Sequence, residues 1–148
     1  MEHRRCTAET AYFRAFLEAN PIGEVFGSPL DVVLSRFDSV EPDLQCVSKE
    51  RAHILSDWVR GAPDLVVEVA STSTRKRDLT IKRDVYARWG VREYWFVDPN
   101  ANSVRVYRES KEGRTFEEPL ELWLDEEDIL ATPLIPGLEL RLADIFKE

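Results

Sequence analysis

The chain has 148 residues, of which 43% are hydrophobic and 32% charged, and a formal net charge of −8. This length predicts one domain over residues 1–148, long enough to bury a core. The sequence has no apolar run near the ~20 residues that a membrane helix needs and no secretory signal at its start. Its acidity disfavours a protein that binds nucleic acid with its whole surface. Cys6 and Cys46 fit no metal-binding spacing and favour a cytoplasmic location with buried free thiols.

The first part of the chain is expected to form a helix followed by short strands. Residues 2–19 have one apolar side and end before Asn20-Pro21, which predicts a helix. Glu9 on this helix is expected to lie on the surface. Residues 23–34 predict two short strands that are broken by a Gly-Ser-Pro turn.

A further strand is predicted over residues 40–48, VEPDLQCVS. Pro42 near its start indicates an edge position or the entry to the strand. Asp43 and Gln45 share one face of this strand, because side chains alternate along it. The next dozen residues predict a short helix or a structured loop. Its single histidine, His53, is more typical of a surface residue than of a ligand.

The clearest pattern, strand, helix and strand, lies between residues 61 and 99. Residues 64–70 are apolar and β-branched enough for a strand buried on both faces, yet Glu68 lies within it. Asp78 is expected to be the N-cap of the helix and Gly90 the residue after its end. Residues 93–97, EYWFV, predict the second buried strand.

The helix is predicted to bury one apolar stripe, which includes a lysine. The apolar members recur at three- and four-residue steps: Leu79, Val85, Tyr86 and Trp89. Lys82 falls within this stripe, so Lys82 and Glu68 are expected to point into the same layer between sheet and helix. Buried charges are costly unless they are paired, hydrated or bound to a ligand. The pair is therefore either a structural ion pair or part of a site.

Charge is unevenly distributed along the chain. Residues 75–92 include seven basic and two acidic side chains, which indicates a phosphate-binding face or a solvated helix face. Residues 103–107 predict a strand, and short strands are expected around Phe116 and Trp123. The apolar strand over residues 133–142 is expected to complete the core or to make a dimer contact.

Two acids and one amine can meet at one end of the predicted sheet. Asp43 lies at the start of one strand, Glu68 within the next and Lys82 on the following helix. Carboxylates bind Mg²⁺ through hard oxygen ligands, and the metal activates water and offsets charge on a phosphate. An ammonium group can steady the attacking water or the transition state. This set suits metal-assisted hydrolysis of a phosphodiester.

Four segments of the chain are distinctive: VEPDLQCVS, GAPDLVVEVASTST, RDLTIKRDVYARWGVREYWFVDP and LIPGLELRL. Together they resemble the Uma2 family of restriction-endonuclease-like proteins, in the PD-(D/E)xK nuclease superfamily. The resemblance covers nearly the whole chain from His3 onward. It implies an α/β (α+β) fold with a restriction-endonuclease-like core, a mixed β-sheet flanked by helices, and a magnesium-dependent nuclease site. In that reading Asp43 is the first acid of the motif and Glu68 the second.

The chain departs from the family pattern in two places. Ala70 stands two places after Glu68, where the superfamily pattern has its lysine, so the resemblance implies that Lys82 supplies this group from the helix. Asp64 is a further candidate or only the entry residue of its strand, since it lies about 13 Å from Glu68 at ~3.3 Å per residue. Gln45 is also a further candidate. Family members usually begin with an additional hairpin, which is expected to be missing here.

The first functional hypothesis is a Mg²⁺- or Mn²⁺-dependent endonuclease that hydrolyses DNA, with Asp43 and Glu68 on the metal and Lys82 beside the water. Its nucleic-acid contacts would be Arg75, Lys76, Arg77 and Arg83. The second hypothesis is a non-catalytic module of the same fold that binds nucleic acid or a protein. The third is a phosphoesterase acting on nucleotides or small phosphates. A homodimer is expected for an enzyme that cuts both strands of a duplex.

Overall fold

The structure is a computed structural model that describes residues 23–27, 31–34, 39–55, 59–71 and 73–146. The helix predicted over residues 2–19 lies outside the described residues, and so do Glu9 and Cys6. No helix in the described part of the chain is long and apolar enough to cross a membrane.

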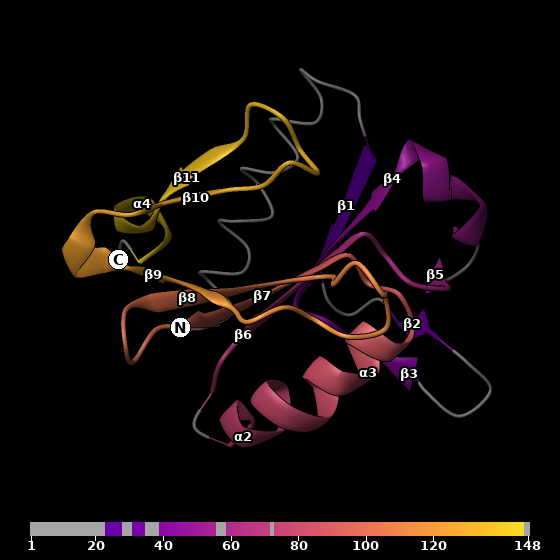
Figure 1. The fold of residues 1–148 in the computed structure, drawn as a ribbon, viewed down its shortest axis with the longest axis horizontal. Coiled ribbons are helices and arrows are strands. Elements are labelled where there is room, and N and C mark those ends of the chain that lie inside the picture. Colours follow the sequence, from indigo (N-terminus) through magenta and orange to yellow (C-terminus); the bar gives the residue numbers. More distant parts are fainter. Residues whose placement is uncertain (1–22, 28–30, 35–38, 56–58, 72, 147–148) are drawn as a thin grey trace.

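A six-stranded sheet forms the centre of the molecule (Figure 1). In spatial order its strands are β1 (Gly23–Gly27), β4 (Leu44–Ser48), β6 (Leu65–Val69), β7 (Glu93–Asp98), β8 (Ser103–Arg108) and β9 (Leu120–Trp123). The pair β6 and β7 is parallel and the other neighbours are antiparallel. The predicted mixed sheet is confirmed. Every residue of β6 and β7 is buried, because both faces of the sheet are covered at its centre.

Two smaller sheets flank the main one. The first contains β2 (Val32–Val33), β3 (Ser39–Val40) and β5 (Val59–Arg60), and the second contains β10 (Ile129–Ala131) and β11 (Glu139–Arg141). Short helical turns complete the described chain: η1 (Lys49–Ile54), η3 (Leu124–Glu126) and α4 (Leu142–Ile145).

One helical segment connects the parallel strands β6 and β7. It runs through α2 (Arg75–Arg77), a π-helical turn η2 (Asp78–Lys82) and α3 (Arg83–Arg88). Two parallel neighbours require such a crossover, because the end of the first strand and the start of the second lie at opposite ends of the strands. Gly90 follows the helix with a φ of 94°, as predicted for the residue that ends it.

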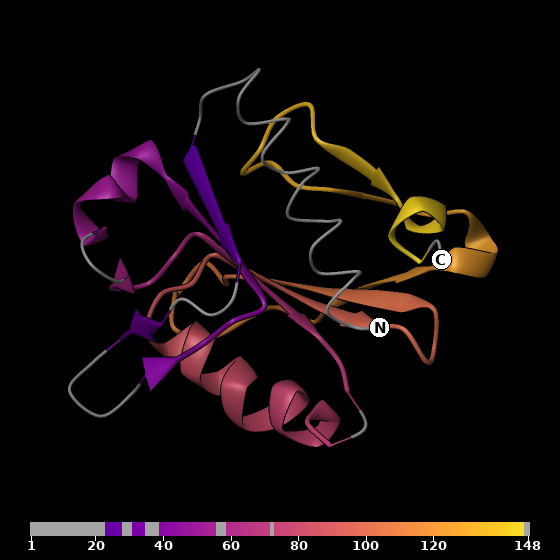
Figure 2. The ribbon, with the colours of Figure 1, turned by 180° about the vertical axis from the view of Figure 1, so that it is seen from behind.

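The sheet separates two cores. Figures 1 and 2 show the helical crossover on one face and the β10–β11 hairpin with α4 on the other. Leu65, Val67 and Val69 point to the hairpin side and pack in one hydrophobic cluster with Leu138 and Leu140. The C-terminal segment therefore completes the core, which was one of the two roles predicted for residues 133–142. Glu68 has the opposite parity and faces the helix.

The opposite face carries the second core, beneath the helix. Its members include Val47, Val66 and Phe96 from the sheet and Tyr86 from α3. Three of the four residues predicted for the apolar stripe pack here: Leu79, Val85 and Tyr86. Trp89 is 39% exposed, so the prediction for this residue is wrong. It lies where the helix ends, and Ala87 takes the buried position instead.

The helix begins earlier than predicted. It starts at Arg75, so the assignment of Asp78 as its N-cap is wrong. The preceding turn is closed by hydroxyl groups: Thr74 N donates to Ser71 Oγ (3.2 Å), and Ser71 N donates to Thr74 Oγ1 (3.3 Å). Thr74 Oγ1 also donates to Asp78 Oδ2 (3.1 Å). Asp78 therefore lies within the helical segment, and its buried carboxylate faces the layer between helix and sheet.

The strand predicted over residues 40–48 is interrupted. Val40 belongs to β3, and β4 begins at Leu44, two residues after Pro42. β4 pairs with β1 on one side and β6 on the other, so Pro42 marks a strand entry and not an edge. Proline lacks the N–H that a ladder needs, which explains why pairing starts after it.

Candidate active site

Asp43 and Glu68 meet where β4 and β6 separate. The ladder between these strands ends at the pair of Leu44 and Val67. One step beyond it, each acid accepts a hydrogen bond from the opposite backbone: Val69 N donates to Asp43 Oδ2 (2.6 Å) and Asp43 N donates to Glu68 Oε1 (3.4 Å). Beyond the last backbone pair, the two carboxylates accept the hydrogen bonds that connect the two segments. These bonds position the two acids side by side.

The helix presents three polar groups to this pair. Asp78, Lys82 and Tyr86 follow one another at four-residue steps and therefore lie on one face of the helix. Lys82 Nζ lies 3.1 Å from Glu68 Oε2 and 3.4 Å from Asp78 Oδ1. The Tyr86 hydroxyl donates to the same Glu68 Oε2 at 2.6 Å. Oε2 is therefore the helix-side oxygen of Glu68, and Oε1 faces Asp43.

Burial sets the protonation of the cluster. Glu68 is 2% exposed, and burial raises its pKa to about 7, although Lys82 and the Tyr86 hydroxyl oppose the rise. The carboxylates of Asp43 and Asp78 add to it. Burial also raises the pKa of Asp78. Burial alone would lower the pKa of Lys82, but the carboxylates of Glu68 and Asp78 outweigh it and the pKa is raised. Lys82 is therefore charged, and Glu68 changes its charge near neutrality.

The structure separates one of the two further candidates from the Glu68 carboxylate. Asp64 lies just before β6, where its carboxylate accepts from Ser48 N (2.7 Å) and lies 3.4 Å from the Nε atoms of both Arg51 and Arg92. This set holds the ends of three segments together and is separate from the Glu68 carboxylate. Gln45 is fully buried in β4, opposite Val66 of β6. It shares the helix-facing side with Asp43.

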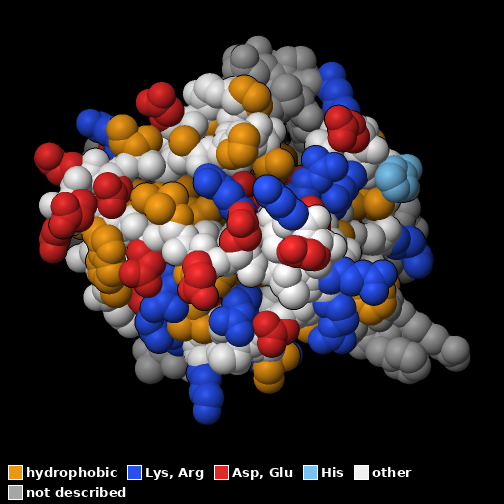
Figure 3. Space-filling model, viewed as in Figure 1, with side chains coloured by type: hydrophobic (Ala, Val, Ile, Leu, Met, Phe, Trp, Pro, Cys, Tyr) orange, Lys and Arg blue, Asp and Glu red, His pale blue; other side chains and the backbone are white. Residues whose placement is uncertain are grey.

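The predicted basic contacts divide into two groups. Arg75 pairs with the buried Asp98 (3.1 Å) and lies over the Phe96 ring, with 5.8 Å from its Cζ to the centroid. Arg83 pairs with Asp84. Lys76 and Arg77 are exposed. Figure 3 shows that basic side chains spread over the middle and right of this face, whereas acidic ones gather near η3.

Comparison with known proteins identifies the family. The family model Uma2, described as "Putative restriction endonuclease", matches residues 2–143. The chain belongs to the Uma2 family. The resemblance of the four segments to Uma2 proteins is thereby confirmed. A search of curated proteins finds no match.

Solved structures support the same fold. A crystal structure from Anabaena variabilis ATCC 29413, of "a putative nuclease belonging to DUF820", superposes with a TM-score of 0.80 at 19% identity, over 99% of this chain and 80% of that one. The type IIG restriction endonuclease BpuSI gives a TM-score of 0.43 at 18% identity, over 74% of this chain and 12% of that one, too low to support an inference. The mixed α/β fold expected from the Uma2 resemblance is confirmed.

The cluster contains two residues for which the sequence predicted other roles. Tyr86 was expected only in the apolar stripe and Asp78 only as a cap, yet both contact the Glu68 and Lys82 pair. The four-residue spacing of these residues with Lys82 was a signal for a shared face. The hydrogen-bond partner of a buried tyrosine hydroxyl, however, depends on the side chains of the element that packs against it, here Glu68 of β6.

The carboxylate pair fits the divalent cation that the Uma2 family implies. The described residues contain no group of three or more His, Cys, Asp or Glu side chains arranged to hold a metal ion. Mg²⁺, however, is usually bound by one or two carboxylates together with water and substrate phosphates. Lys82 and Tyr86 both bind Oε2, so the short contacts leave Glu68 Oε1 on the side of Asp43. Three carboxylates against one lysine also leave negative charge that a cation would offset.

Proposed function

We propose that the protein is a Mg²⁺- or Mn²⁺-dependent endonuclease that hydrolyses phosphodiester bonds of DNA. The observation that carries the proposal is the position of Asp43 and Glu68, side by side where two strands separate, with Lys82 on the second acid. Membership of a family described as "Putative restriction endonuclease" supports the choice of DNA as substrate.

Each residue of the cluster has a distinct role in this proposal. Asp43 and Glu68 would hold the cation, which would supply charge stabilisation and an activated water. Tyr86 fixes the orientation of Glu68 through its bond to Oε2. Lys82 is charged and stands next to the acids, where it can orient the attacking water or offset charge on the phosphate. Asp78 holds Lys82 in this position.

Calorimetric titration with Mg²⁺ and Mn²⁺ tests the metal site. Glu68→Gln and Asp43→Asn keep a hydrogen-bond acceptor in place but remove the charge, so the folded proteins are expected to lose cation binding. Asp125→Asn removes the same kind of charge from the exposed acidic turn and is the control. Nicking of a supercoiled plasmid by the wild type, abolished by chelation and by both site variants, would then show the activity.

The main alternative is a catalytically degenerate module in which Glu68 and Lys82 form only a structural ion pair. Wild-type protein that binds neither cation, and does not cut DNA at pH 8, would favour this module and contradict the nuclease. The homodimer is part of the nuclease proposal. The edge strand β9 and its neighbourhood expose Leu120, Trp123 and Ile129, which are candidates for the contact. Light scattering of the purified protein measures the assembly.

A further inference from the structure

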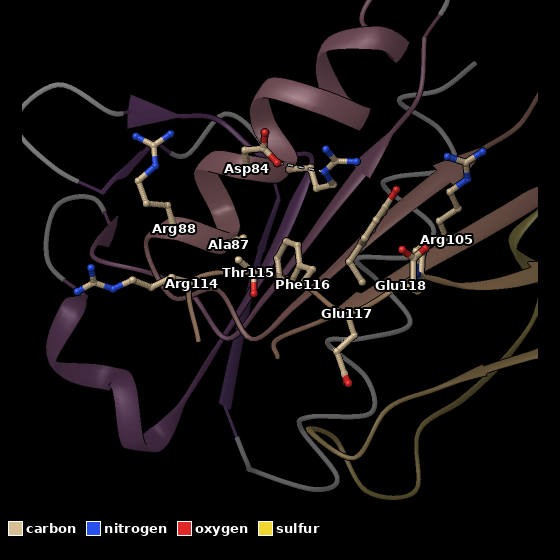
Figure 4. Close-up of a pocket in the computed structure, with 12 residues that line it drawn as sticks. Asp84, Ala87, Arg88, Arg105, Arg114, Thr115, Phe116, Glu117 and Glu118 are labelled. Carbon is tan, nitrogen blue, oxygen red and sulfur yellow. Dashed lines mark hydrogen bonds and ion pairs between the residues drawn. The ribbon is translucent and has the colours of Figure 1, made fainter. Parts of the chain in front are cut away.

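An open groove lies beside the candidate active site. It is formed by α3, by β8 and by residues 114–119, and its volume is about 640 Å³ (Figure 4). This volume lies within the range of small-molecule binding sites. The groove is on the helix-facing side of the sheet. None of the residues that line it belongs to the carboxylate cluster.

Four arginines from three segments line the groove, and two of them are not neutralised. Arg83 pairs with Asp84 (3.2 Å) and Arg105 with Glu121 (3.4 Å). Within the described part of the chain, Arg88 and Arg114 have no carboxylate partner within 4.0 Å. Figure 4 shows both on the same side of Phe116. Both guanidinium groups are exposed and come from separate elements, and each has the forked donors with which arginine binds a phosphate.

An aromatic surface lies next to this pair. Phe116 is half-buried and lines the groove, and it is backed by Tyr107 (ring centroids 5.9 Å apart) and Tyr94 (6.4 Å). Tyr107 and Tyr94 stack on each other at 5.7 Å. Because the phenyl ring is supported from below, it can present a rigid face to a planar group. Nucleobases stack on such rings with little dependence on sequence.

The groove also contains acids, which narrow the class of ligand. Glu117 and Glu118 line it together with the arginines. In Figure 4, Glu118 lies near Arg105, away from Arg88 and Arg114. A ligand that is anionic throughout would be repelled at this end. A nucleotide has a phosphate at one end and a base with amino donors at the other, and carboxylates accept hydrogen bonds from such amino groups.

The strand register connects the groove with the acids. Glu68 is paired with Phe96, Phe96 with Arg105, and Arg105 with Glu121, so these side chains form one row across the sheet. Arg105 is thus two strand spacings, or about 10 Å, from Glu68.

We propose that the groove is a nucleotide-binding subsite, in which Arg88 and Arg114 bind a phosphate and Phe116 stacks on the base. The nucleotide belongs either to an unpaired strand that continues from the cut site or to a free mononucleotide. The first source rests on the proposed nuclease function. A base stacked on Phe116 must be out of a duplex, so the subsite selects single-stranded nucleic acid over a duplex.

Fluorescence anisotropy with a labelled oligodeoxynucleotide of about 12 residues tests the subsite. Chelator is present throughout, so neither cleavage nor the metal site contributes. Arg88→Ala and Arg114→Ala are each expected to weaken binding several-fold and to reduce the salt slope by about 0.7, the value for one phosphate on a single strand. Arg141→Ala removes an exposed arginine from β11, on the other side of the sheet, and is the matched control.

Phe116→Leu separates stacking from charge. It is expected to weaken binding at least about fivefold without a change in salt slope. The arginine variants are at exposed positions and keep the test valid if Phe116→Leu fails to fold. Displacement of the oligonucleotide by dAMP at equal nucleotide concentration would confirm the subsite with a free nucleotide as its ligand. Binding by both arginine variants that equals that of Arg141→Ala, or a preference for duplex, would overturn the proposal.

The outcomes for the groove and for the nuclease can be told apart. Oligonucleotide binding that depends on Arg88 and Arg114, in a protein that binds no cation and cuts nothing, would support the groove and contradict the nuclease. Mg²⁺-dependent cleavage with an unchanged KM in both arginine variants would support the nuclease and overturn the groove.

Discussion

Replacement of Tyr86 by phenylalanine tests how the helix controls the acid at the centre of the site. The Tyr86 hydroxyl donates a 2.6 Å hydrogen bond to Glu68 Oε2 and lowers the pKa of that carboxyl against the effect of burial. A hydrogen bond to a charged group contributes about 1.5–3 kcal/mol, and one pKa unit corresponds to about 1.4 kcal/mol. Loss of the hydroxyl should therefore raise the pKa of Glu68 by about one to two units, from about 7.

Cation binding reports this shift, because the metal requires the ionised carboxylate. In the wild type, the apparent affinity for Mn²⁺ should rise about tenfold per pH unit and level off above about pH 7. In Tyr86→Phe, the levelling should move to about pH 8–9, so that binding at neutral pH falls roughly 5- to 50-fold and recovers at high pH. Calorimetric titrations at a series of pH values measure both curves.

A neighbouring tyrosine provides the control. The Tyr94 ring lies 5.1 Å from that of Tyr86, but its hydroxyl donates to the backbone oxygen of Asp78 (2.9 Å). Tyr94→Phe therefore removes an equally buried hydroxyl without touching Glu68 and should leave the pH midpoint of binding unchanged. A midpoint that does not move in Tyr86→Phe, or that moves equally in Tyr94→Phe, would refute the reasoning.

Three further predictions follow from the same cluster and its surroundings. The pKa of Glu68 in the folded protein is about 7, above its ordinary value of 4.5, so the native state binds more protons than the unfolded state between these values. The free energy of unfolding should therefore fall as pH rises through this window, by up to about 3 kcal/mol. Urea unfolding of wild type and Glu68→Gln should show this difference, and parallel curves would contradict it. Lys82→Met should reduce DNA cleavage at least about 100-fold, while Mn²⁺ binding persists at high pH, because loss of the ammonium group raises the pKa of Glu68 further. Loss of binding at high pH would instead make Lys82 part of the metal site. Asp64→Asn should cost about 2–4 kcal/mol of unfolding free energy, since it leaves Arg51 and Arg92 without their shared buried acid, with Mn²⁺ binding intact; lost binding at full stability would place Asp64 in the site.

The central strand, helix and strand could be predicted from the sequence, and so could the faces on which Glu68 and Lys82 lie. Alternation placed Glu68 opposite Leu65 and Val67, and the structure has these residues on opposite faces of β6. The helical period placed Lys82 on the buried side, where it contacts Glu68. These predictions succeed because the period of each element is a local property of the backbone.

Which side chains come into contact could not be predicted from the sequence. Asp43 and Glu68 are 25 residues apart, and each accepts a backbone hydrogen bond from the opposite segment because the ladder between β4 and β6 ends beside them. The groove unites Arg88 with Arg114 through the packing of α3 against the segment after β8, which no spacing encodes. Local pattern specifies the face of an element, whereas strand order, register and the packing of distant segments specify its neighbours.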